Sequence, residues 1–159
     1  MNKITQEMNG DLVEYQTDRI QNLITEMVEC CDDRKLYESR KFDLPYAELK
    51  SLMLFKGERY LTPKVMAQKL DVAKSRITKL TKGLLAKGLI DQIDDPADAR
   101  IRLLRLSPEG RKLADRIETF EKDVHRQVLL QMDETERKHV LSYMESLRSA
   151  MEAVKNKLV

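Results

Sequence analysis

The sequence predicts a mainly helical protein that contains one small β-hairpin. Over most of the 159 residues, apolar residues recur three and four positions apart, which is the spacing of one face of an α-helix. Only five Gly and four Pro interrupt the chain. Residues 89–106 differ, because two short apolar runs there flank a turn-rich centre, a pattern typical of a hairpin.

The first helix is expected over about residues 11–34. Its apolar stripe consists of Ile20, Leu23, Ile24, Met27, Val28 and Cys31. A second helix is expected to start at Pro45, because the first helical turn tolerates proline, and to end near Gly57.

Two further helices are expected on either side of a short turn. Thr62 and Pro63 have the residue types of an N-cap and a first helical position, so they begin one helix. Asp71 and Val72 would form the turn into the next helix, which Gly88 ends. Two short helices joined by a tight turn form a helix-turn-helix.

The second helix of this pair lies in the most basic part of the chain. Between Val72 and Ile90 there are five basic residues and no acidic residue, although the whole chain has a formal net charge of only +2. By region, the net charge is −3 for residues 1–56, +5 for residues 57–106 and 0 for residues 107–159. A basic centre between acidic or balanced arms indicates a nucleic-acid surface.

The two sides of this basic helix differ in chemistry. Ile77, Leu80 and Leu84 share one side, and hydroxyl and amine side chains project from the other. Lysine neutralises phosphate, and Ser or Thr can bond to the DNA backbone or to base edges. The alternative is a solvated lysine-rich face without a ligand.

A β-hairpin is expected directly after the basic helix. Residues 89–93 would form the first strand, residues 94–98 the turn and residues 101–106 the returning strand. Its arginines, Arg100, Arg102 and Arg105, continue the positive charge. A hairpin in this place is typical of the wing of a winged helix-turn-helix; the alternative is a surface hairpin that only closes the domain.

The C-terminal part is expected to be helical. Ser107 and Pro108 begin one helix, and Asp133 with Glu136 forms a capping box that begins the last one. The last helix carries a regular apolar stripe of Val140, Met144, Leu147, Met151, Val154 and Leu158. Such a stripe needs a partner, either the first helix of the chain or a second subunit, and we expect both.

The domain organisation follows from these elements. Residues 45–107 are expected to form a winged helix-turn-helix domain. Residues 1–44 and 108–159 are expected to form a helical dimerisation region.

Several classes of protein are not expected from this sequence. No stretch approaches the roughly 20 apolar residues of a membrane span, so we expect no membrane contact and a cytoplasmic protein. Cys30, Cys31, His125 and His139 do not have the spacing of metal ligands, so we expect no metal and no cofactor. Nothing resembles a nucleophile with its base, a phosphate loop or paired carboxylates, so we expect no enzyme.

The helix-turn-helix of residues 61–90 and the segment of residues 95–110 resemble the multiple-antibiotic-resistance regulator, or MarR, family. The more specific part is Asp98-x-Arg100, followed by an apolar strand, Leu106-Ser107 and Gly110. The resemblance implies a homodimer that binds double-stranded DNA and regulates transcription, as a ligand-responsive repressor on an imperfect palindrome.

The expected DNA contacts fall into three groups. Ser75, Thr78, Lys79 and Lys82 would face the major groove, Lys74 and Arg76 would lie on flanking phosphates, and Arg100 or Arg102 would reach the minor groove. Lys87 is expected outside the groove. Asp98 is expected to be structural, holding a neighbouring arginine and shaping the wing.

Four positions depart from the usual family pattern. Asp71 replaces a glycine, which requires a left-handed aspartate. Ala73 replaces a serine, which removes an N-cap hydroxyl, and Ala99 stands where a second arginine is common. Gly83 interrupts the basic helix.

The resemblance also implies a small aromatic or phenolic effector. Its candidate lining residues are Met27, Cys31, Tyr37, Tyr46 and Met53, for which core packing is the alternative. Redox sensing by Cys30 and Cys31 is a further alternative, but their acidic neighbours disfavour a thiolate, and we expect both to pack as small buried apolar residues. A winged-helix module that binds another protein is the alternative to a DNA-binding regulator.

Overall fold

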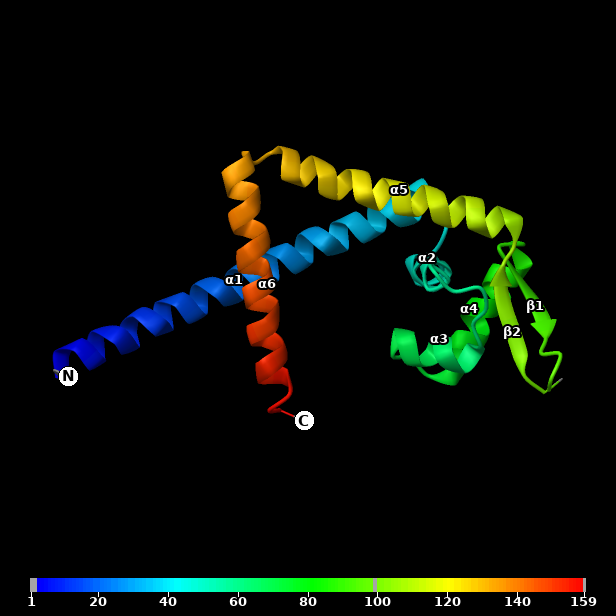
Figure 1. Cartoon of the computed structure of the whole chain (residues 1–159), viewed down its shortest axis with the longest axis horizontal. Helices are drawn as coiled ribbons and strands as arrows, with labels where there is room; N and C mark the ends of the chain where they lie inside the picture. The colour runs from blue at the N-terminus through cyan, green and yellow to red at the C-terminus, as the bar shows by residue number, and fades with distance from the viewer. Residues whose placement is uncertain (1–2, 99, 159) are drawn as a thin grey trace. The chain divides into compact units, whose positions relative to one another are not determined.

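The computed structural model describes residues 3–98 and 100–158, with side chains from residue 10 onward (Figure 1). Ala99 therefore lies outside the described residues. The elements are α1 (Lys3–Lys41), α2 (Tyr46–Met53), α3 (Pro63–Leu70), α4 (Lys74–Ala86), β1 (Ile90–Asp94), β2 (Arg102–Leu106), α5 (Pro108–Leu130) and α6 (Glu134–Lys155). The predicted fold class, mainly helical with one hairpin, is confirmed.

The chain divides into two compact units, Met1–Arg111 and Lys112–Val159. The first unit contains α1 to β2 and the start of α5. The predicted grouping of residues 1–44 with residues 108–159 as one dimerisation region stays a prediction.

The first helix is longer than its apolar stripe predicts. It runs from Lys3 to Lys41 instead of from about residue 11 to residue 34. Polar helix formers such as Lys and Glu extend a helix without contributing to the apolar pattern, so the pattern marks only part of it. Pro45 is the N-cap of α2, so this helix begins at Tyr46, one position after the predicted start.

The helix-turn-helix forms through local signals. The Thr62 hydroxyl accepts a hydrogen bond from the Val65 N–H at 3.2 Å, and Pro63 is the first residue of α3. Asp71 ends α3 in the left-handed conformation at φ 52°, while the Val72 N–H donates to the Ala67 carbonyl at 3.1 Å. The N-cap of α4 is Ala73, whose side chain makes no capping hydrogen bond. The predicted conformation of Asp71 and the missing cap at Ala73 are both confirmed.

The left-handed conformation of Asp71 leads to a stability prediction. Asp71→Gly should raise the free energy of unfolding by about 0.5–1 kcal/mol, because glycine adopts this left-handed conformation without the Cβ clash. The greater conformational entropy that glycine gives to the unfolded chain offsets part of the gain. Asp71→Ala is the matched control, since it keeps the Cβ and should give no gain. Urea unfolding followed by circular dichroism measures both. A glycine variant no more stable than the alanine variant would contradict the prediction.

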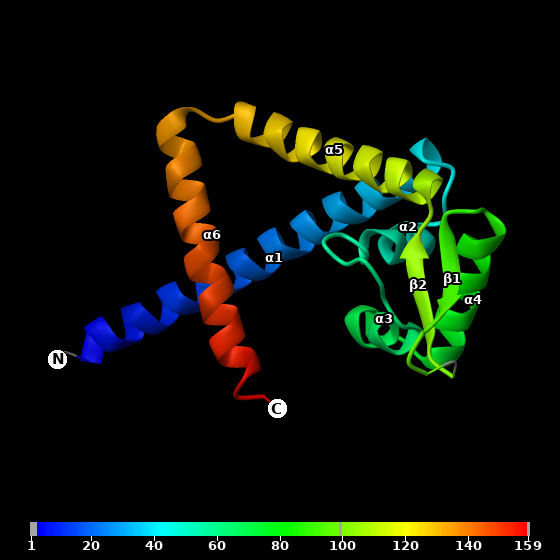
Figure 2. The ribbon, with the colours of Figure 1, turned by 45° about the vertical axis from the view of Figure 1, so that its right-hand side comes forward.

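The wing is joined to the start of α3. Strands β1 and β2 pair antiparallel from Ile90 opposite Leu106 to Asp94 opposite Arg102. Leu61 adds a single bridge, because its N–H and carbonyl bond to the carbonyl and N–H of Leu104 at 2.9 and 2.8 Å. Figure 2 shows α4 lying alongside this hairpin. The core of this domain consists of Leu49, Leu52, Leu61, Met66, Ile77, Leu84, Ile90 and Leu104, all buried.

A tight junction joins the end of α4 to the start of α5. The Ser107 hydroxyl donates to the Gly88 carbonyl at 2.6 Å and accepts from the Gly110 N–H at 2.9 Å. Gly110 lies directly against the backbone of Leu89, so that an added Cβ would stand only 2.8 Å from the Leu89 carbonyl carbon. Only glycine fits at position 110 without a shift of one of these segments.

The predicted capping box at the start of α6 is confirmed. Asp133 accepts hydrogen bonds from the N–H groups of Thr135 and Glu136, and the Glu136 carboxylate accepts from the Asp133 N–H at 2.8 Å. The helix ends at Lys155. The prediction was therefore wrong for Leu158, which lies beyond the helix because Asn156 already caps it.

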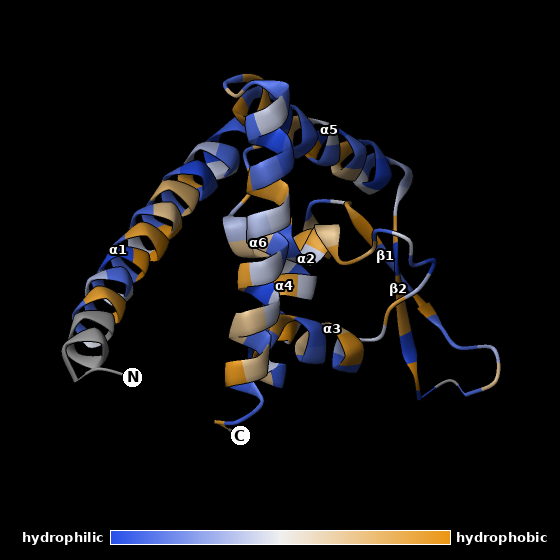
Figure 3. Ribbon diagram, turned by 60° about the vertical axis from the view of Figure 1, so that its left-hand side comes forward, coloured by the Kyte–Doolittle hydropathy of each residue, from blue (hydrophilic) through white to orange (hydrophobic). Residues whose placement is uncertain are grey.

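Large apolar side chains are exposed along α1 and α6 of the single chain. On α1 they include Leu23, Met27 and Val28, and on α6 Met144, Met151 and Val154. Figure 3 shows apolar positions, in orange, on both helices. Within the described part of the chain, no helix combines the length and apolar character that a membrane crossing requires.

Candidate nucleic-acid interface

Helix α4 separates a buried side from an exposed basic one. Ile77, Thr81 and Leu84 are buried among the residues of the domain core. All six side chains of α4 that were predicted to contact DNA are exposed: Lys74, Ser75, Arg76, Thr78, Lys79 and Lys82. The predicted division of this helix into two faces is thus present in the structure.

The charges of this exposed surface are not neutralised by ion pairs with the residues that the structure describes. Lys74, Arg76, Lys79 and Lys82, which we call the basic face, form no ion pair with any described residue. Lys87, the fifth cation of the segment, differs because its ammonium group pairs with the Glu48 carboxylate of α2. The basic face therefore presents four positive charges that an anionic ligand could neutralise.

The two hydroxyl groups beside the basic face have different hydrogen-bonding capacity. The Thr78 hydroxyl donates to the Lys74 carbonyl at 3.1 Å, so its oxygen can still accept but its proton is used. Ser75 is exposed and no hydrogen bond of its side chain is found among the described residues, so it can donate or accept. Thr78 would suit a base amino group, and Ser75 would suit either a base or a phosphate.

The wing carries two further cations without partners among the described residues. Arg100 and Arg102 are exposed and unpaired there. Arg105 instead forms an ion pair with Asp91, its direct neighbour across the hairpin, at 3.3 Å. The predicted continuation of positive charge along the wing therefore rests on Arg100 and Arg102.

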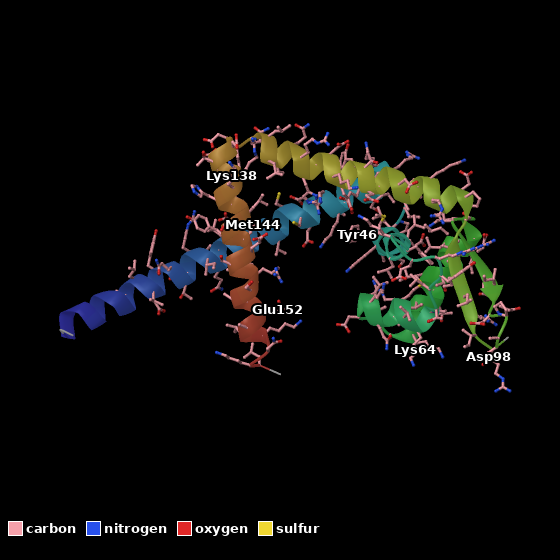
Figure 4. The ribbon with its side chains drawn as sticks, in the orientation of Figure 1. Tyr46, Lys64, Asp98, Lys138, Met144 and Glu152 are labelled. Atoms are coloured by element: carbon pink, nitrogen blue, oxygen red, sulfur yellow. The ribbon has the colours of Figure 1, made fainter. Side chains whose placement is uncertain are left out.

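Asp98 lies at the tip of the wing (Figure 4). Its carboxylate accepts a hydrogen bond from the backbone N–H of Arg100 at 2.9 Å, and its carbonyl accepts from the Ile101 N–H at 2.9 Å. The aspartate thus bonds to the backbone of the neighbouring arginine, not to its guanidinium group. These bonds support a structural role for Asp98, which stays a prediction.

The five predicted effector residues lie on two helices. Met27, Cys31 and Tyr37 are exposed on α1, and Tyr46 and Met53 are half-buried on α2. Of these, Tyr46 lines an open hollow of about 410 Å³ between α2 and α4. Its other lining residues are Ala47, Lys50, Leu70, Val72, Arg76 and Leu80. Nothing in the sequence pattern marks this hollow, because it depends on how α2 and α4 pack; the effector site stays a prediction.

The predicted burial of Cys30 and Cys31 was wrong for the single chain. Both thiols are exposed, because this part of α1 has almost only exposed side chains around them. Among the described residues, no three His, Cys, Asp or Glu side chains are grouped so that they could hold a metal ion.

Comparison with known proteins agrees with this geometry. The model of the MarR family matches residues 42–101. No curated protein matches the chain. Among solved structures, the chain is similar to a mutant of MepR from S. aureus, with a TM-score of 0.77 and 18% identity over 82% of this chain and 97% of that one.

Two other solved structures are similar to this chain to about the same degree. The YusO protein from Bacillus subtilis gives a TM-score of 0.74 at 21% identity, covering 86% of this chain and 97% of that chain. FabT of Streptococcus pneumoniae, solved in complex with DNA, gives a TM-score of 0.74 at 18% identity, covering 85% and 99%. These likenesses show the fold, and the family match covers the helix-turn-helix, β1 and the turn that follows it, and ends directly before β2. The predicted resemblance is confirmed: residues 42–101 of this chain match the MarR family model, and the chain has the fold of the MepR, YusO and FabT structures.

Proposed function

We propose that this protein is a homodimeric, sequence-specific DNA-binding regulator of transcription that acts as a repressor. The observation that carries the proposal is the basic face of α4, four exposed cations that no described acidic side chain neutralises. No described side chain supplies the anionic partner, and double-stranded DNA fits this convex helical surface better than a small anion does.

The dimensions of α4 suit the major groove. Its 13 residues span about 20 Å, and a groove about 12 Å wide admits a helix. Ser75, Thr78, Lys79 and Lys82 would meet base edges, while Lys74 and Arg76 would lie on phosphates. Arg100 and Arg102 of the wing would enter the neighbouring minor groove, where narrow A·T-rich segments attract guanidinium groups.

A homodimer is part of the proposal. Exposed apolar side chains on α1 and α6 support it, since monomers rarely leave such long apolar stripes in water. Two copies would place their α4 helices about 34 Å apart on an operator of two half-sites in inverted orientation. Occupation of that operator would exclude the transcription machinery. Such a regulator works in the cytoplasm, and a small aromatic or phenolic effector would release it by favouring another spacing of the α4 helices.

Salt dependence and selection of DNA together test this function. An operator selected from a random pool should be an imperfect palindrome, and sedimentation should show a dimer bound to it. With Lys74 and Arg76 of both subunits on phosphates, the logarithm of the affinity should fall with log salt with a slope of at least about −4. A salt-independent affinity, a monomer, or enrichment of no sequence would contradict the proposal. Capture of an acidic protein by a chain that ignores DNA would favour the interaction module instead.

A further inference from the structure

The contact between α2 and α4 contains a carboxylate where a side chain of α4 would normally stand. Gly83 lies inside α4, and a Cβ built on it would overlap an oxygen of Glu48 and stand 3.1 Å from that residue's carboxyl carbon. The Glu48 carboxylate therefore occupies the space that Gly83 leaves empty. Glycine is less favourable in a helix interior than the unbranched helix formers, so α4 accommodates the Glu48 carboxylate at a cost to its own helical stability.

The same carboxylate holds a second point of α4. Its other oxygen pairs with the ammonium group of Lys87, one turn after Gly83. The Glu48 side chain is only 13% exposed, whereas Lys87 is 41% exposed. Because Glu48 is largely shielded from water, loss of Lys87 would leave its carboxylate charge poorly solvated and without this partner.

Apolar packing does not fill the whole contact between α2 and α4. The open hollow beside Arg76 and Leu80 separates Tyr46, Ala47 and Lys50 of α2 from the first half of α4. Ile77 and Leu84 anchor α4 on its core side. Glu48 adds contacts between α2 and the second half of α4 at two positions, Gly83 and Lys87.

We propose that Glu48 is a positioning residue for DNA recognition. Seated against Gly83 and paired with Lys87, it fixes the orientation in which α4 presents its basic face. The pair also keeps Lys87 away from phosphate. This inference rests on the proposed DNA-binding function, since it concerns how α4 meets base edges. Correct orientation matters for base contacts, which require defined geometry, and much less for attraction to phosphate.

A cycle of variants tests the inference: Gly83→Ala, Glu48→Ala, the double variant, and Glu48→Gln. Gly83→Ala should weaken operator binding about tenfold, because base contacts that are displaced lose the geometry they require. It should change affinity for random-sequence DNA less than about twofold. In the Glu48→Ala background, Gly83→Ala should cause no further loss of operator affinity. Glu48→Gln, which keeps the side-chain volume but breaks the ion pair, should also reduce operator affinity selectively.

The matched control is Gly10→Ala, the same substitution within α1, where an added Cβ meets nothing within 4 Å. It should leave operator affinity unchanged. Circular dichroism and the melting temperature of each variant distinguish a loss of folding from a change in the orientation of α4. If Gly83→Ala does not fold, Glu48→Gln still provides the test. Full operator affinity in Gly83→Ala, equal losses on operator and random DNA, or additive losses in the double variant would overturn the inference. Failure of the wild type to bind DNA would instead reject the proposed function.

Discussion

Gly110→Ala should lower the free energy of unfolding by about 3 kcal/mol or more, because overpacking against an immobile neighbour is among the costliest of single substitutions. The added methyl group would overlap the Leu89 backbone, which cannot rotate away as a side chain would. Ser107 fixes both sides of the contact through its bonds to Gly88 and Gly110. Urea unfolding at a fixed protein concentration should show a lower midpoint with an unchanged slope.

Gly10→Ala is again the matched control. An alanine in this exposed helical position should leave stability unchanged or raise it by up to about 1 kcal/mol. If Gly110→Ala unfolds at the same urea concentration as the wild type, the junction is not as rigid as its contacts indicate.

Lys79→Ala with Lys82→Ala should reduce operator affinity by about 1000-fold, because the two subunits together lose four groove contacts worth about 1 kcal/mol each. Lys74→Ala with Arg76→Ala removes the same charge from the phosphate-facing positions. It should weaken operator and random-sequence DNA alike and make the salt slope shallower by about 4. Fluorescence anisotropy over a series of salt concentrations measures all of these quantities.

The control for this pair of double variants removes two lysines outside the winged domain. Lys122→Ala with Lys138→Ala lowers the net charge by the same amount, and both lysines pair with a glutamate on their own helix. DNA affinity should stay close to that of the wild type. Identical losses and slopes for all three double variants would mean that only net charge matters, and the assignment of α4 to the groove would be wrong.

The signals that predicted the fold were local ones. Thr62 with Pro63, and Asp133 with Glu136, define helix starts through hydrogen bonds that span only three residues. The left-handed turn at Asp71 was equally predictable, because aspartate tolerates a conformation that the helix-turn-helix needs. The spacing of apolar residues predicted the two faces of α4. It did not predict the full length of α1, because polar residues can extend a helix without adding to the apolar stripe.

The features that could not be predicted depend on contacts between distant residues. The pairing of Glu48 with Lys87 and the hollow beside Arg76 both require the packing of α2 on α4. Gly83 looked like a defect of the basic helix, because the sequence gives no sign of the carboxylate that fills its place. Exposure of Cys30 and Cys31 was missed for a related reason: an apolar stripe indicates that a face can be buried, but not which molecule covers it.

The seat of Glu48 against Gly83 also has an evolutionary consequence. A substitution at either position alone is expected to be unfavourable. A side chain at position 83 would collide with Glu48. A shorter residue at position 48 would remove the ion pair with Lys87 and leave the space beside Gly83 empty. The two positions should therefore change together in related chains. A chain with a large residue at position 83 would have to give up the glutamate as well, and the proposed positioning role predicts that its α4 would be oriented differently and would favour other operator sequences.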